Sequence, residues 1–88
     1  MSRTLGSPRH GALIQFLCYK RKKAGLSQAQ LAAKLGRYQS FVATVESGQR
    51  RIGVVEFLDF ADAIDFDARE GIKRLTRTDR LAARADRT

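Results

Sequence analysis

The stretch that decides the fold is residues 26–48, LSQAQLAAKLGRYQSFVATVESG, in which apolar residues recur at helical spacing on both sides of a glycine. Leu35 precedes Gly36, and Val42 and Val45 follow it at an i, i+3 interval. Glycine readily adopts the left-handed conformation that ends a helix. The pattern therefore predicts two short helices, joined by a turn, whose apolar faces pack together at a sharp angle.

Two helices joined in this way form a helix-turn-helix, which leaves the second helix free to enter a DNA major groove. Ser27 is a favourable N-cap for the first helix, which we expect at Gln28 to Leu35. The second is expected from about Gln39 to Ser47.

The stretch and its flanks resemble the lambda-repressor-like (Cro/repressor, XRE-type) helix-turn-helix family. The resemblance covers roughly residues 13–66 and is carried by Arg21, residues 24–28 (AGLSQ), residues 46–50 (ESGQR) and residues 54–58 (VVEFL) with their continuation to Ile64. It implies an all-α, five-helix DNA-binding domain.

Helical periodicity over the rest of the chain predicts three more helices. They span about Arg9 to Lys23, Val54 to Ile64, and a segment after Asp67 that reaches about Leu75. Residues 78–87 either extend the last helix or form a separate turn, and the end of the chain is expected to fray. We expect a flexible arm at residues 1–7, the DNA-binding domain at 8–66 and a C-terminal helix and tail at 67–88.

Within the helix at 54–64, one stripe of apolar residues is expected to face the core. It consists of Val54, Phe57, Leu58, Ala61 and Ile64. The acidic residues Glu56, Asp59 and Asp62 are expected to form a solvent-exposed stripe that points away from DNA.

Charge is distributed unevenly along the chain. The formal net charge is +8, but residues 1–53 carry +9 and residues 54–88 carry −1. The basic part contains the helix-turn-helix, as expected of a nucleic-acid binder. A solvated basic face that serves only solubility would explain the total but not this asymmetry.

Several classes of function are disfavoured by what the sequence lacks. Cys18 is the only cysteine and His10 the only histidine, so we expect no disulfide, no metal site and no cofactor. Cys18 is interpreted as a small apolar residue of the first helix, and His10 lies near an end expected to be mobile. No apolar run approaches membrane length, which favours a cytoplasmic protein that does not contact membranes. No nucleophile, base and orienting group occur together, so an enzyme is not expected.

Glu46 is the only acid among the first 53 residues and lies on the helix expected to face DNA. An unpaired carboxylate there would weaken binding to a polyanion, so a partner is needed. The family resemblance implies that Arg21 is this partner, in a largely buried ion pair.

Candidate base contacts lie on the exposed side of the second helix of the motif, where it enters the groove. They are Tyr38, Gln39, Ser40, Ala43 and Thr44. Gln39 is the strongest, because a glutamine amide both donates and accepts and so matches adenine N6 and N7. Candidate phosphate contacts lie at the start of the first helix of the motif and on both sides of its second helix. They are Ser27, Gln28, Arg37, Gln49, Arg50 and Arg51. The resemblance also implies that Gln28 braces Gln39.

Three positions depart from the family pattern. Arg37 and Tyr38 replace a small apolar residue and a capping Ser or Thr, so the second helix has a weaker cap and Tyr38 has its hydroxyl available for a phosphate. Phe41 is larger than usual and either packs onto the helix at residues 28–35 or contacts a thymine methyl group.

The sequence thus predicts a sequence-specific transcriptional regulator, a repressor, that binds a palindromic DNA operator as a homodimer. Phe60 and Phe66 are the expected dimer contacts. Two alternatives remain at this stage: an antitoxin that pairs with a toxin and represses its own operon, and a protein-interaction module that sequesters a partner.

Overall fold

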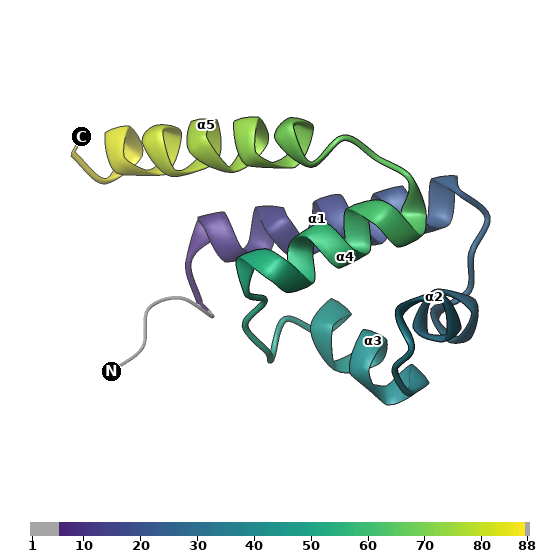
Figure 1. The fold of residues 1–88 in the computed structure, drawn as a ribbon. Coiled ribbons are helices and arrows are strands. Elements are labelled where there is room, and N and C mark those ends of the chain that lie inside the picture. Colours follow the sequence, from purple (N-terminus) through teal and green to yellow (C-terminus); the bar gives the residue numbers. More distant parts are fainter. Residues whose placement is uncertain (1–5, 88) are drawn as a thin grey trace.

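The computed structural model describes the backbone of residues 6–87 and the side chains of residues 6–78. This part of the chain contains five helices and no strand, so the predicted all-α fold is confirmed: α1 (Pro8–Lys23), α2 (Gln28–Leu35), α3 (Gln39–Glu46), α4 (Val54–Ile64) and α5 (Ala68–Arg87). In Figure 1, α1 and α4 lie in the middle of the molecule, with α2 and α3 on one side and α5 on the other. Residues 1–5 of the predicted arm and Thr88 lie outside the described residues.

The first helix begins one residue earlier than predicted. Pro8 occupies its first turn, where the missing N–H costs no hydrogen bond. The Ser7 hydroxyl accepts a hydrogen bond from the His10 backbone N–H at 3.0 Å. Ser7 is therefore the N-cap of α1 rather than part of a flexible arm.

The helix-turn-helix forms at the predicted residues. Gly36 follows α2 with a φ of 69°, the left-handed conformation that ends the helix and turns the chain toward α3. The third helix ends at Glu46, one residue before the predicted end, and Ser47 is its C-cap.

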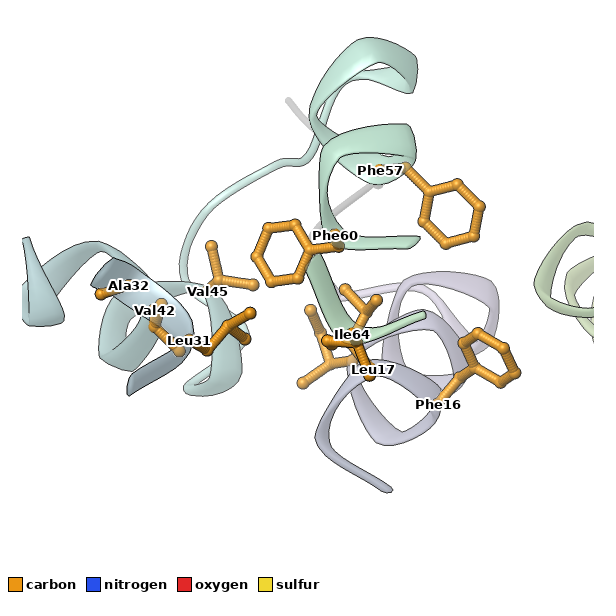
Figure 2. Close-up of a cluster of buried hydrophobic side chains, with 10 residues drawn as sticks. Phe16, Leu17, Leu31, Ala32, Val42, Val45, Phe57, Phe60 and Ile64 are labelled. Carbon is orange, nitrogen blue, oxygen red and sulfur yellow. The ribbon is translucent and has the colours of Figure 1, made fainter. Parts of the chain in front are cut away.

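The core lies where α1, α2, α3 and α4 meet, and Figure 2 shows its side chains. Its fully buried members include Phe16 and Leu17 from α1, Leu31 from α2, Val42 and Val45 from α3 and Phe60 from α4. Figure 2 shows the Phe60 ring directed from α4 toward Val45 of α3. The helix-turn-helix is therefore anchored to α4 by an aromatic side chain.

The predicted inward face of α4 was partly wrong. Val54 and Leu58 are 75% and 45% exposed, whereas Phe60 is 1% exposed and packs against Phe41 with 6.1 Å between the ring centroids. Apolar residues occur nearly all round this helix, so periodicity alone does not choose the buried side. The neighbouring helices choose it, and the buried face is centred roughly half a residue step, about 50°, from the predicted one.

The last helix is continuous to Arg87, so residues 78–87 extend it rather than forming a separate turn. Asp67 precedes it, and its carboxylate accepts a hydrogen bond from the Arg69 backbone N–H at 2.9 Å. Phe66 packs edge-on against Phe16, with ring centroids 5.1 Å apart. No helix in the described part of the chain is both long enough and apolar enough to traverse a lipid bilayer.

Gly71 permits the close approach of α5 to the core. A Cβ atom added at Gly71 would lie 2.7 Å from Phe57 Cζ and 2.9 Å from Phe16 Cε2, well inside contact distance. Because a helical glycine costs about 1 kcal/mol relative to alanine, its presence is explained by this packing.

Candidate nucleic-acid interface

The N-terminus of α2 carries Ser27 and Gln28, two of the residues expected to contact phosphate. The Ser27 hydroxyl accepts a hydrogen bond from the Gln30 backbone N–H at 3.0 Å, and Gln30 Oε1 accepts one from the Ser27 N–H at 2.8 Å. This capping box fixes the first turn of the helix. The positive end of the α2 dipole, with the exposed Ser27 beside it, is therefore presented at the surface.

Gln39 lies at the first turn of α3 and contacts Gln28. Its Nε2 donates a hydrogen bond to Gln28 Oε1 at 2.8 Å, while the Gln39 side chain remains exposed. The expected bracing contact is thus present, and it restricts the conformations available to the Gln39 amide.

The other candidate base contacts follow Gln39 along α3 or precede it. Tyr38 is 86% exposed and makes no side-chain cap for the helix. Ser40 and Thr44 are exposed and Ala43 is half-buried. The Thr44 hydroxyl donates to the Ser40 backbone carbonyl at 2.8 Å, so its oxygen remains as an acceptor. Ser40, Ala43 and Thr44 lie on the first two turns of α3, and Tyr38 is its N-cap residue.

Glu46 and Arg21 form the expected ion pair between α3 and α1. Arg21 Nε lies 2.6 Å from Glu46 Oε2, Nη2 lies 2.9 Å from Oε1, and the two side chains are 10% and 7% exposed. Arg21 Nη1 also donates to the Leu26 carbonyl at 2.8 Å, and Gln28 Nε2 donates to Glu46 Oε1 at 2.9 Å. Burial acts to raise the pKa of Glu46, but hydrogen bonds from Arg21 and Gln28 outweigh it and the pKa is lowered.

Cys18 is not the purely apolar residue that the sequence indicated. It is half-buried, and its Sγ lies 3.6 Å from Glu46 Oε1 and 3.9 Å from Arg21 Nη2. A thiol is a weak donor and acceptor, so it tolerates the edge of this ion pair.

A second cluster joins the start of α3 to the start of α4. Arg50 contacts both carboxylate oxygens of Glu56, at 3.0 and 3.1 Å, and Arg37 lies 3.7 Å from the same carboxylate. The Arg37 and Arg50 guanidinium carbons lie 3.8 and 4.9 Å from the centroid of the Phe41 ring. Glu56 Oε1 also accepts from the Gly53 N–H, and hydrogen bonds from Arg50 and Gly53 lower the pKa of Glu56.

This cluster corrects the expectation that Glu56 belongs to a solvent-exposed acidic stripe. Asp59 and Asp62 are exposed as expected, but Glu56 faces the arginines and only about a quarter of its side chain, 26%, is exposed. The charges of Arg37 and Arg50, both predicted phosphate contacts, are therefore partly compensated within the protein. Gln49 and Arg51 are exposed in the same loop between α3 and α4.

His10 was missed as a structural residue. It is 6% exposed, and its Nε2 lies 3.2 Å from the Gly48 carbonyl oxygen, directly after α3. The spacing in the sequence could have indicated this, because His10, Ile14, Leu17 and Arg21 recur at intervals of four, three and four residues and so share one helix face. In the structure all four are buried. His10 thus links the start of α1 to the loop that carries three predicted phosphate contacts.

Comparisons with known proteins agree with this geometry. The family model described as "Helix-turn-helix domain" matches residues 20–75. That range contains the whole helix-turn-helix and α4, together with the end of α1 and the start of α5. The chain belongs to the XRE-type helix-turn-helix family.

Two solved structures resemble this XRE-type chain. An XRE-family like protein from Pseudomonas syringae pv. tomato str. DC3000 is 42% identical with a TM-score of 0.74, over 78% of this chain and 84% of the other. The restriction-modification controller protein C.AhdI from Aeromonas hydrophila is 34% identical with a TM-score of 0.62, over 81% of this chain and 99% of the other. No match was found among curated proteins. The fold and the motif thus identify the chain as a DNA-binding regulator of the XRE family.

Proposed function

We propose that this chain is a sequence-specific transcriptional repressor that binds a palindromic operator as a homodimer. The observation that carries the proposal is Gln39, which is exposed on the groove-facing helix and held by Gln28 in a fixed contact. A bidentate amide so positioned is suited to adenine in the major groove. Repression requires only that the bound protein occupies the operator, and the likeness to a controller protein supports a regulatory use of binding.

Phosphate contacts are proposed to supply most of the affinity. Ser27 and Gln28 lie at the N-terminus of α2, and Gln49, Arg50 and Arg51 lie in the loop after α3. Two such groups of residues flank the base-contacting helix, so they would hold the protein on both sides of the groove that α3 enters.

The test measures binding to DNA as a function of salt. If about six phosphates are neutralised per dimer, log K plotted against log salt should have a slope of about −5. Gln39→Ala should weaken binding to the DNA site that the wild-type protein prefers by about 1–3 kcal/mol. It should have little effect on binding to random DNA and should not change the slope. An affinity that does not depend on salt would contradict DNA binding, and equal losses on both DNAs would show that Gln39 contacts only the backbone.

The dimer contact is proposed to lie on α4, at residues other than those expected from the sequence. Phe60 is 1% exposed, so it is not available for the predicted contact, and the half-buried Phe66 packs against Phe16 within the same chain. Instead Val54, Val55 and Leu58 are 75%, 71% and 45% exposed on the outer side of α4. Apolar residues grouped in this way are a natural two-fold contact, since the same patch on two copies buries itself.

Leu58→Glu tests this contact and Ile72→Glu is its control. Both residues are exposed and apolar, but Ile72, 52% exposed, lies on α5. Leu58→Glu should give a folded monomer in sedimentation and light scattering with weakened operator binding, and Ile72→Glu should remain dimeric. A Leu58→Glu protein that stays dimeric would place the contact elsewhere.

A further inference from the structure

A continuous set of hydrogen bonds links the core to the base-contacting side chain. Glu46 accepts from Arg21 through both carboxylate oxygens, at 2.6 and 2.9 Å, and from Gln28 Nε2 at 2.9 Å. Gln28 Oε1 accepts from Gln39 Nε2 at 2.8 Å. Three helices therefore contribute to one connected set that begins at α1 and ends at the exposed surface of α3.

Every hydrogen bond in this set is donated in the direction of Glu46. An ionised carboxylate only accepts hydrogen bonds, whereas an amide has one accepting end and one donating end. Glu46 thus requires Gln28 to turn its Nε2 inward, which places Gln28 Oε1 toward Gln39. Gln39 must then offer its Nε2 to Gln28. The reversed orientation of Gln28 would bring two acceptor oxygens together.

The fixed orientation determines what Gln39 still offers to DNA. With one N–H used by Gln28, the amide keeps its Oε1 acceptor and a second N–H donor. Adenine presents a donor at N6 and an acceptor at N7, which match this pair. A reversed Gln39 would have its oxygen occupied and would offer only donors, which match guanine N7 and O6.

We propose that Glu46 is a specificity-determining positioning residue, whose carboxylate acts through Gln28 to fix the Gln39 amide in the orientation that selects adenine over guanine. This role rests on the proposed function, in which Gln39 contacts a base. The Glu46 side chain is 7% exposed and bonded to Arg21, so it acts from within the protein and not by touching DNA.

Two substitutions alter the direction of the hydrogen bonds. Glu46→Gln introduces an amide that can accept from Arg21 at one end and donate to Gln28 Oε1 at the other, so both orientations of Gln39 become accessible. Gln28→Lys places a group that only donates between Glu46 and Gln39. The ammonium can bond to the Glu46 carboxylate and to Gln39 Oε1, which reverses Gln39.

The control is Gln30→Lys, which adds the same charge two residues along α2. Gln30 contacts Ser27 and has no hydrogen bond to Glu46 or Gln39 among the described contacts. Its added positive charge should strengthen binding to all DNA alike, without changing base preference.

The experiment starts from a pool of DNA duplexes of about 30 base pairs with a randomised centre, from which the wild-type protein selects its site. The position at which Gln39→Ala loses selectivity is then compared as A·T and as G·C in otherwise matched duplexes. We expect wild type to prefer adenine by about 5- to 150-fold, the range of one good bidentate contact. Glu46→Gln should reduce this preference at least several-fold, Gln28→Lys should invert it, and Gln30→Lys should leave it unchanged.

The outcomes distinguish a failure of the proposed function from a failure of the role of Glu46. If wild type does not bind DNA, the proposed function fails and the role of Glu46 fails with it. If wild type prefers adenine but a folded Glu46→Gln protein, or Gln28→Lys, keeps the full preference, only the role of Glu46 is overturned. Circular dichroism reports folding, and if Glu46→Gln does not fold, Gln28→Lys decides because it leaves the Arg21–Glu46 pair intact.

Discussion

Glu46→Ala should cause a large loss of stability, because it leaves Arg21 buried without its carboxylate. Arg21 as a residue is 8% exposed, and the substitution removes both of its contacts with Glu46 as well as the contact from Gln28. Stranding one member of a buried pair costs about 3–5 kcal/mol. For a domain of this size that corresponds to a fall in Tm of roughly 12 °C or more, at about 4–8 °C per kcal/mol.

The assay is thermal and urea unfolding followed by circular dichroism, with Asp59→Ala as the matched control. Asp59 is an exposed acid on α4, so its removal changes net charge equally and should shift stability by less than about 0.5 kcal/mol. Glu46→Gln should cost less than Glu46→Ala, because the amide still accepts from Arg21. If Glu46→Ala melts within a degree or two of wild type, the pair does not hold α1 to α3 and the reasoning is wrong.

The same pair predicts a dependence on pH. The pKa of Glu46 is lowered from 4.5 in the folded protein, so its contribution to stability is fully present above the unfolded value and is lost as pH falls through the folded value. The stability difference between wild type and Glu46→Gln, which does not titrate at this position, should therefore shrink as pH is lowered below about 4.5. A difference that stays constant into strong acid would contradict an ionised, paired Glu46.

Further substitutions test three features described above. Gly71→Ala should destabilise the protein by about 1–3 kcal/mol in urea unfolding because it overpacks the contact of α5 with the core, whereas Gly11→Ala, in open space on α1, should stabilise it by up to about 1 kcal/mol. Glu56→Gln should release Arg50 toward DNA, raise affinity for random duplexes and steepen the salt slope by about one unit; unchanged binding would show that the arginine does not reach a phosphate. His10→Phe should lose about 1 kcal/mol or more, because the Gly48 carbonyl loses its partner, and a stability equal to that of wild type would assign His10 no structural role.

The helix-turn-helix was predictable because its ends are determined locally. Ser27 and Gly36 define α2 through a capping box and a left-handed C-cap, both of which depend on neighbouring residues alone. The Arg21–Glu46 pair followed from the family resemblance and from the need to neutralise a lone acid on a DNA-facing helix. The helix ends required no knowledge of how distant segments pack, whereas Arg21, 25 residues from Glu46, was identified as its partner only through the resemblance.

The errors arose where packing between distant segments decides the outcome. The side of α4 that is buried depends on where α3 and α5 lie, so Phe60 was assigned to the surface and Leu58 to the core. Glu56 looked solvent-exposed because its arginine partners come from other parts of the chain. Gly71 has no local role that would distinguish it from any helical glycine, since only the approach of two aromatic rings explains it.

The different anchoring of the α3 side chains has a consequence for how DNA preference can evolve. Ser40 and Thr44 are exposed, and the Thr44 hydroxyl bonds within α3 to the Ser40 carbonyl, so substitutions there need not disturb the core. Gln39 is tied through Gln28 to a buried carboxylate that also holds α1. Among diverging relatives, operator sequences should therefore change first at the bases opposite Ser40 and Thr44. The base opposite Gln39 should change only where Gln28 or the buried Glu46 is also replaced.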